Sequence, residues 1–387
     1  TMSHIAAVSG VLPPHRYPQA ELTRMFADVV DDPERTLNRG VLHRLHANAG
    51  VEFRHLAIPL QQYAELAGFT QANDLFIATA VDLGAQAVRD ALEQAGLTPR
   101  DVDLFVSTTV TGLAVPSLDA RIAGRLGMRT DVKRVPIVGL GCVAGAAGIA
   151  RVHDYLLGHP HDVGVLLAVE LCSLTVQRDD TSVANLIASG LFGDGAAAVV
   201  VTGAARAAST ATAPTPTAHT NTAPTAHTNT VPTPMATTSP VEVLASRSRL
   251  YPDTERAMGW DVGASGLRIV LGVEVPLLVR DHVRADVDGF LAAHGLRRQD
   301  IGWWVAHPGG PKVLEAMAGA LGVERDALAL TWDSLARIGN LSSASVLHVL
   351  ADTLRVRPPA PGSYGVLLAM GPGFCLELVL LRAGCAP

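Results

Sequence analysis

Three residues stand in short motifs whose chemistry fits together. Cys142 lies in Gly-Leu-Gly-Cys-Val-Ala-Gly-Ala-Ala-Gly, His307 in Trp-Val-Ala-His-Pro-Gly-Gly-Pro, and Asn340 in Gly-Asn-Leu-Ser-Ser-Ala-Ser. A thiolate is the best side-chain nucleophile toward a thioester, and an imidazolium or a helix N-terminus beside the sulfur favours that anion. His307 and Asn340 could also donate to a thioester carbonyl while negative charge develops on its oxygen. Together the motifs predict a Cys-His-Asn acyl-transfer site.

The residues around Cys142 predict how the nucleophile is positioned. Helical periodicity runs through residues 151–157, and the residues just after the cysteine are small enough for close packing of such a helix against its neighbours: Gly145, Ala146, Ala147, Gly148 and Ala150. We therefore expect Cys142 at a strand-to-helix turn, against the positive end of the helix dipole.

Taken one at a time, each motif also has a plain structural interpretation. A lone cysteine in an apolar run is often a small buried side chain, His307 before Pro-Gly-Gly could be a turn histidine, and Asn340 after a glycine could be a capping residue. The other cysteines form no CxxC pair, so structural thiols are expected at Cys172, Cys375 and Cys385. The joint occurrence of three matching motifs favours the catalytic interpretation.

Apolar and helical segments alternate along the chain, which indicates an α/β protein. Predicted helices cover residues 74–95, 118–126, 276–294, 311–321 and 343–354, and predicted strands cover 102–109, 163–169, 301–306, 364–370 and 375–381. The pattern divides the chain into two similar halves, 1–203 with the cysteine and 241–387 with the histidine and asparagine. Between them, residues 204–240 are nearly all Thr, Ala and Pro and repeat Thr-Ala-His-Thr-Asn-Thr, so we expect a disordered surface insertion.

Composition narrows the function classes. The 387 residues are 48% hydrophobic and 17% charged, which is enough for a substantial core. A net charge of −6 without basic clusters argues against nucleic acid as a partner. The uncharged run at 135–150 includes the nucleophile helix and is too short for a membrane span, and residues 1–10 lack a signal-peptide pattern. We expect a cytoplasmic protein with no membrane span and no metal site.

Across nearly the whole chain outside 204–240, the sequence resembles the type III polyketide synthases, the chalcone-synthase-like branch of the thiolase superfamily. Besides the three motifs, Leu-Phe-Gly-Asp-Gly-Ala-Ala-Ala-Val at 191–199 and Met-Gly-Pro-Gly-Phe at 370–374 are similar to family motifs. The resemblance implies a duplicated thiolase fold with αβαβα layers, a homodimer, acyl-CoA and malonyl-CoA as substrates, and no cofactor. Starter β-ketoacyl synthases share the three catalytic residue types but usually carry His-Gln-Ala-Asn, whereas this chain has His-Pro-Gly-Gly.

The resemblance also implies roles for further residues. Phe192 matches a gatekeeping phenylalanine, Val115 matches a loop that family members insert into the partner's chamber, and Arg44 matches a cation for CoA phosphates. A neighbouring family lysine is replaced by Asn48. The chamber is expected to include Thr111, Cys172, Thr175, Ile269, Ser342, Gly371, Pro372 and Gly373.

The expected starter is inferred from a similarity to one branch of this family. The pattern looks most like the mycobacterial long-chain alkylpyrone synthases, in which positions matching Thr111 and Cys172 line an acyl tunnel. Each buried methylene contributes about 0.8 kcal/mol, so a tunnel would favour fatty acyl-CoA, extended by decarboxylative condensation with malonyl-CoA to an alkylpyrone or alkylresorcinol. The alternatives are a short or aromatic starter, a starter β-ketoacyl synthase, an inactive thiolase-fold binding protein and a papain-type cysteine hydrolase.

Overall fold

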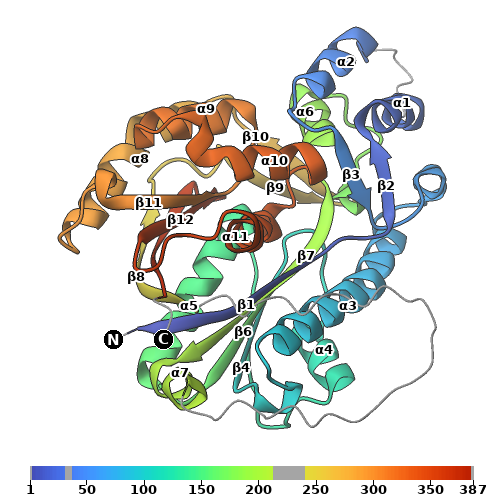
Figure 1. The fold of residues 1–387 in the computed structure, drawn as a ribbon. Coiled ribbons are helices and arrows are strands. Elements are labelled where there is room, and N and C mark those ends of the chain that lie inside the picture. Colours follow the sequence, from blue (N-terminus) through green and yellow to red (C-terminus); the bar gives the residue numbers. More distant parts are fainter. Residues whose placement is uncertain (1, 31–36, 212–239, 385–387) are drawn as a thin grey trace, which may run out of the picture.

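The computed structural model describes residues 2–30, 37–211 and 240–384. One nine-stranded sheet runs through the molecule (Figure 1). Its order is β5 (Lys133–Ile137), β4 (Leu104–Thr108), β6 (Val163–Leu171), β7 (Asp194–Gly203), β1 (Ser3–Val11), β8 (Val241–Leu250), β13 (Cys375–Ala383), β12 (Tyr364–Gly371) and β11 (Ile301–Ala306). The pairs β4–β5, β4–β6 and β11–β12 are parallel and the others are antiparallel. The first strand, β1, joins the two halves because it pairs with both β7 and β8.

Helices cover the sheet in three layers. Helices α5 (Ala144–Gly158) and α11 (Ser345–Val356) pack between the two halves, and their apolar side chains share one core with strands of both. Helices α3 (Phe69–Gln94) and α4 (Leu118–Leu126) cover the outer face of the first half, and α8 (Val275–Ala292) and α9 (Pro311–Leu321) cover that of the second. The expected αβαβα layering is confirmed.

Small residues explain why α3 lies so close to the sheet. Its buried stripe includes Ala80, Gly84, Ala87 and Ala91, which recur at the spacing of one helical face. A Cβ at Gly84 would lie 2.9 Å from a methyl group of Leu167 on β6, so a larger residue at this crossing would force that side chain to shift.

A further group of elements forms a lobe above one end of the sheet (Figure 1). The ribbon β2 (His15–Pro18) and β3 (Phe53–Leu56) carries α1 (Gln19–Val29) and α2 (Arg39–Ala47). Helix α6 (Val183–Leu191) and the hairpin β9 (Met258–Gly263) and β10 (Gly266–Leu271) pack beside them, and α10 (Ala329–Ile338) precedes α11. Short 3-10 turns occur in both parts of the structure, including η1 (Leu60–Glu65), η3 (Gly141–Val143) before α5, η4 (Cys172–Thr175) after β6 and η7 (Ser342–Ala344) before α11. None of the helices in the described part of the chain is long and apolar enough to span a bilayer.

Most predicted elements are present. Helices 118–126 and 311–321 and strand 301–306 have the expected ends, since left-handed glycines, Gly127 and Gly322, end the two helices and Pro311 begins the second. Helix α3 begins five residues earlier than predicted, at Phe69. The helix predicted from 343 is preceded by η7 and begins at Ser345.

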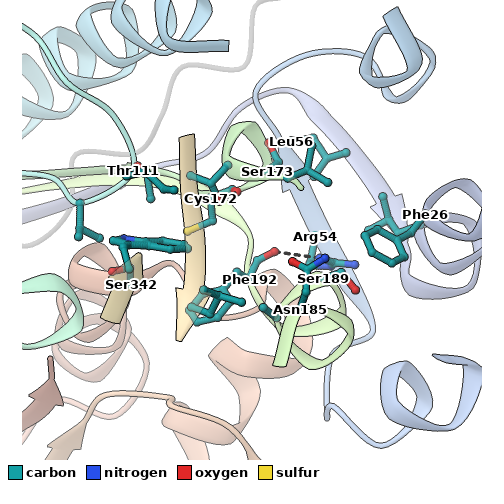
Figure 2. A pocket seen from close by; sticks show the side chains of 18 of the residues that line it. Phe26, Arg54, Leu56, Thr111, Cys172, Ser173, Asn185, Ser189, Phe192 and Ser342 are labelled. Atoms are coloured by element: carbon teal, nitrogen blue, oxygen red, sulfur yellow. Dashed lines mark hydrogen bonds between the residues drawn. The ribbon is translucent and has the colours of Figure 1, made fainter. Parts of the chain in front are cut away.

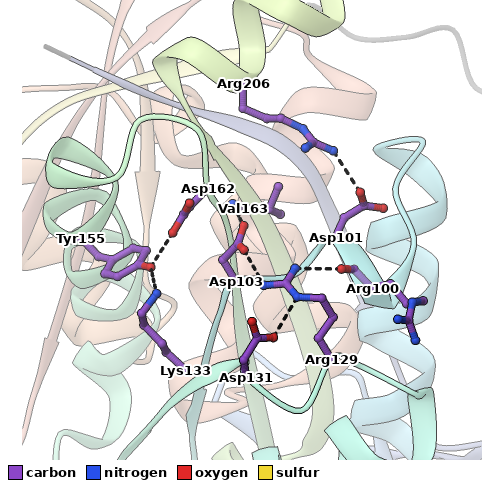
Figure 3. Close-up of polar contacts among 10 residues, drawn as sticks. All are labelled: Arg100, Asp101, Asp103, Arg129, Asp131, Lys133, Tyr155, Asp162, Val163 and Arg206. Carbon is purple, nitrogen blue, oxygen red and sulfur yellow. Dashed lines mark hydrogen bonds and ion pairs between the residues drawn. The ribbon is translucent and has the colours of Figure 1, made fainter.

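The prediction for residues 204–240 needs a correction at its start. Residues Ala204–Ala211 form helix α7, because this run is rich in alanine, the best helix former. Arg206 on α7 forms an ion pair with Asp101 at 3.0 Å. Figure 3 shows this pair beside a second one, between Arg129 and Asp103 at 2.8 Å. The rest of the predicted insertion, residues 212–239, lies outside the described residues.

Candidate active site

Cys142 lies in η3, directly before helix α5, as expected for a nucleophile at a strand-to-helix turn. Its side chain is buried, and its Sγ lies 3.5 Å from Ser342 Oγ on η7. Tight packing fixes this turn, because a Cβ on Gly371 would lie 2.7 Å from the Val143 backbone nitrogen. The loop from β12 therefore supports the backbone under the cysteine.

The second half of the chain contributes His307 and Asn340. His307 follows β11 and is buried, with no hydrogen-bond partner for its Nδ1 among the residues described. Asn340 follows α10 and is also buried, and its backbone amide donates to the Leu191 carbonyl at 2.9 Å. The first predicted half thus supplies Cys142 and the second supplies His307 and Asn340. Ser342, two residues after Asn340, lies beside the cysteine.

The orientation of the Asn340 amide is set by its own loop. The backbone N–H of Ser342 donates to Asn340 Oδ1 at 2.8 Å, which fixes this oxygen as the acceptor. Ser342 holds a left-handed φ of 51°, a conformation that costs a non-glycine residue about 1 kcal/mol or more. Within the described chain, Nδ2 of Asn340 has no partner, so its N–H groups are available to a substrate oxygen.

Burial opposes charge on both members of the expected ion pair. It raises the pKa of Cys142 to about 12 and lowers the pKa of His307 to about 3. Each group taken alone is therefore neutral at pH 7, and no hydrogen bond joins the Cys142 and His307 side chains, both of which the structure describes. A thiolate at this position requires proton transfer to the imidazole, with the N-terminus of α5 favouring the anion.

A buried acid, Glu170, links the wall of the site to η7. Its carboxylate accepts hydrogen bonds from the Thr111 hydroxyl at 2.9 Å and from the Ser343 hydroxyl at 2.5 Å. Burial is the main cause that raises the pKa of Glu170, and the hydroxyl and amide donors act against it. This network ties β6 to the turn that carries Ser342, and the sequence motifs did not indicate it.

One mostly apolar cavity, with about 1140 Å³ of empty space including its open mouth, extends from the cysteine. Eight of the predicted residues line it: Cys142, Thr111, Cys172, Thr175, Phe192, Ile269, Ser342 and Pro372. Figure 2 shows Thr111, Cys172, Phe192 and Ser342 toward one end of this cavity and Phe26 toward the other. The structure therefore brings these eight residues together around one cavity, whereas His307 and Asn340 are not among the residues that line it.

Other predicted residues lie elsewhere. Val115 is 95% exposed and does not line the cavity of this chain. Gly371 and Gly373 pack behind it, against Val143 and Cys375. Arg44 lies on the exposed side of α2, so its contact with CoA phosphates stays a prediction.

The far end of the cavity was missed from the sequence. Phe26 of α1 marks this end, and the cavity residues that the motifs did not indicate come from α1, β3, η1 and the β9–β10 hairpin: Leu22, Met25, Phe26, Val29, Arg54, Leu56, Leu60, Tyr63, Trp260 and Leu267. An available signal was the spacing of Leu22 and Phe26, which places them on one helical face. The charged residue Arg54 gave no signal of its own.

Comparison with known proteins identifies relatives over the whole chain. Residues 2–205 match the family model for the N-terminal domain of chalcone and stilbene synthases, and residues 242–384 match the model for the C-terminal domain.

Individual relatives and a solved structure agree with these matches. A 1,3,6,8-tetrahydroxynaphthalene synthase of Streptomyces peucetius subsp. caesius is 53% identical over 98% of this chain and 92% of its own length. A 3,5-dihydroxyphenylacetyl-CoA synthase of Amycolatopsis orientalis is 30% identical over 98% of this chain and 94% of its own. The crystal structure of 1,3,6,8-tetrahydroxynaphthalene synthase from Streptomyces coelicolor A3(2), a bacterial type III polyketide synthase, superimposes with a TM-score of 0.85, 27% identity and coverage of 99% of this chain and 100% of that one.

Proposed function

Since this chain belongs to the chalcone and stilbene synthase family, and is a type III polyketide synthase, we propose that Cys142, His307 and Asn340 carry its decarboxylating condensation. Enzymes of this family are acyltransferases that use CoA thioesters and need no cofactor. The geometry that supports the assignment is the buried thiol before α5, the His307 Nδ1 without a partner among the described residues, and the Asn340 amide, whose Oδ1 accepts from the Ser342 backbone N–H.

The proposed reaction starts with loading of the starter. The Cys142 thiol attacks the thioester carbonyl, its proton passes to His307, and the CoA thiolate leaves with a proton. Malonyl-CoA then loses CO2, and the enolate oxygen accepts hydrogen bonds from His307 and Asn340 Nδ2. The enolate carbon attacks the acyl carbonyl on Cys142, so a carbon–carbon bond forms as the carbon–sulfur bond breaks.

For the product, we propose a tetrahydroxynaphthalene built from malonyl-CoA alone. The observation that carries this proposal is the 53% identity to a 1,3,6,8-tetrahydroxynaphthalene synthase. Such a naphthalene has ten carbons, which five two-carbon units supply. One aldol closure with loss of water and one Claisen closure with release of CoA convert the linear pentaketide into the two rings. No fatty acyl starter is needed.

The test is incubation of the purified enzyme with malonyl-CoA as the sole substrate, followed by mass spectrometry of the products. Carbon-13 malonyl-CoA should label every carbon of a tetrahydroxynaphthalene. The proposal is wrong if product forms only after another acyl-CoA is added. Cys142→Ala is the matched control, because it retains the cavity and removes the nucleophile.

A second candidate function is use of a long-chain fatty acyl starter, with an alkylpyrone or alkylresorcinol as product. The observation that favours it is the apolar far end of the cavity beside α1. Met25→Trp should fill this end, whereas Arg24→Trp places the same side chain on the exposed side of α1. Competition between lauroyl-CoA and malonyl-CoA distinguishes the two functions. A lauroyl-primed product that Met25→Trp reduces and Arg24→Trp does not would favour the fatty acyl starter.

We also propose a homodimer. Strand β5 is an edge strand with exposed residues, and Val138, directly after it, is 74% exposed. Leu113 and Val115, before α4, are exposed apolar side chains as well. An unpaired edge with apolar neighbours favours pairing with a second copy. Light scattering after size-exclusion chromatography should give twice the chain mass, and Val138→Glu should shift it toward one chain. A single-chain mass for the unmodified protein would refute the dimer.

A further inference from the structure

Arg54 on β3 is a buried cation that the proposed chemistry does not use. Its residue surface is only 5% exposed, and it lines the cavity between Cys172 and Phe26 (Figure 2). No carboxylate lies within 4.0 Å of its guanidinium in the described part of the chain, although Asp194 acts on it at longer range. Burial lowers the pKa of Arg54 to about 10, so the side chain still carries its charge at pH 7. A buried cation without an ion pair is costly and calls for a role.

Hydrogen bonds connect the Arg54 guanidinium, through Phe192, to Asn340, the proposed oxyanion donor. Its Nη1 donates to the Phe192 carbonyl at 2.9 Å. Phe192 pairs with Asn340 in a parallel bridge, in which the Gly193 amide donates to the Asn340 carbonyl at 2.9 Å. The Asn340 amide in turn donates to the Leu191 carbonyl at 2.9 Å. The carbonyl held by Arg54 therefore lies in the segment that fixes both backbone groups of Asn340.

The stem of Arg54 also packs against the residue before Asn340. Gly339 has a φ of 75°, and a Cβ there would lie 3.2 Å from Arg54 Cγ and 2.9 Å from the Leu191 carbonyl oxygen. Glycine at this position both permits the left-handed backbone and leaves room for the arginine. Arg54 thus contacts the chain on both sides of the bridge.

The other end of the guanidinium is fixed in turn. Arg54 Nε donates to Gln19 Oε1 at 3.1 Å. The amide nitrogen of Gln19 donates to the carbonyls of Gly190 at 2.7 Å and His46 at 3.2 Å. Because Gln19 is held at three points, the guanidinium has one defined position, and a planar guanidinium with several donors suits this better than a lysine.

We propose that Arg54 is a positioning residue for the condensation. Through the Phe192 carbonyl and Gly339, it sets where the Asn340 amide lies relative to Cys142, and it does not itself contact the reacting atoms. Displacing an oxyanion donor by about 1 Å can cost about 100-fold in rate. Loss of the guanidinium is therefore expected to slow the step that forms the enolate.

The test measures malonyl-CoA decarboxylation in Arg54→Met, Asn340→Ala and the double variant. Arg54→Met should lower kcat by about 10- to 100-fold and leave the KM for malonyl-CoA within about twofold. In the Asn340→Ala background the same change should have almost no further effect, because the residue that Arg54 positions has lost its amide. If the double variant instead shows the product of the two single-variant losses in kcat, the proposal is overturned. A change in KM without a change in kcat in Arg54→Met would overturn it as well.

Two further variants keep the outcome clear. Arg16→Met removes an exposed arginine from the neighbouring strand β2 and should behave as the unmodified protein. If Arg54→Met does not fold, Arg54→Lys takes its place in the same cycle, with an intermediate loss of kcat expected and multiplying losses again overturning the proposal. Unchanged decarboxylation in Asn340→Ala alone would instead refute the role of Asn340 as oxyanion donor.

Discussion

Replacement of Gly145 by alanine should push η7, which carries Ser342, away from helix α5, which follows Cys142. Gly145 lies in α5, one helical turn after Cys142, where α5 crosses η7 and α11. An added Cβ would lie 2.3 Å from the Ser343 carbonyl oxygen and 2.7 Å from a methyl group of Val346. The first contact is with backbone, which cannot rotate away. Relief to an ordinary contact distance requires η7 to move by about 1 Å.

The expected magnitudes follow from this displacement. Overpacking a core typically costs about 1–3 kcal/mol, and the better helix propensity of alanine offsets about 1 kcal/mol. The free energy of unfolding should therefore fall by up to about 2 kcal/mol. Activity should fall by more than this implies, because η7 carries Ser342 and follows Asn340, and a shift of about 1 Å at such donors costs about 100-fold.

Urea denaturation measures the expected loss of unfolding free energy, and malonyl-CoA turnover measures the expected loss of activity. Gly124→Ala in α4 is the matched control, since its added Cβ meets nothing within 4 Å and should stabilise the protein by about 1 kcal/mol without altering turnover. Gly148→Ala, on the same helix as Gly145, meets the side chain of Leu166. It should lower stability and largely retain activity. The reasoning is refuted if Gly145→Ala is as stable and active as the unmodified enzyme.

Four other outcomes are expected. Cys142→Ala should abolish acylation, and intact-protein mass spectrometry that finds the acyl group on Cys172 would contradict this. His307→Ala should raise the apparent pKa of the Cys142 thiol in iodoacetamide rates measured against pH, and an unchanged pKa would mean that the two groups do not exchange a proton. Cys172→Phe should lower the ratio of turnover for long against short acyl-CoA if the cavity is an acyl tunnel, whereas an equal loss for both, with a lower melting temperature, would indicate ordinary overpacking. Burial raises the pKa of Asp194 to about 6, so the free energy of unfolding should fall as pH rises from about 4 to about 6, where the folded protein keeps this proton and the unfolded chain releases it. Asp194→Asn should flatten this part of the dependence of unfolding free energy on pH, measured by urea denaturation. An unchanged slope would refute the pKa shift.

Local sequence was sufficient for the elements whose ends carry their own signals. Helix 118–126 ends at a left-handed glycine, and helix 311–321 begins at a proline and ends at another such glycine. Strand β1 lacked a comparable signal, because what defines it is pairing with β7 almost 200 residues away. Helix α7 was missed because its alanines were grouped with the Thr/Ala/Pro segment that follows.

The residues of the candidate site also fall into two groups, those that stand in a local sequence motif and those that do not. Cys142, His307 and Asn340 each stand in a local motif, so their types and context were sufficient to predict that they act together. Arg54 and Glu170 have no motif of their own, and their importance depends on partners far along the chain, such as Phe192 and Ser343. The starter could not be predicted from the motifs, since the cavity is lined jointly by α1, β3, η1 and the β9–β10 hairpin, which are far apart in the sequence.

The position of α5 between the two halves also has a consequence for synthesis of the chain. Its apolar residues Ala146 and Ile149 share a core with Val346 and Leu347 of α11, some 200 residues later. A nascent chain that has not yet extended to residue 345 must leave that side of α5 without its partner helix. Contacts between residues so distant in sequence close slowly, and exposed apolar surface promotes aggregation during the delay. The helix that directly follows the nucleophile is thus among the last parts of the nascent enzyme to be shielded from water.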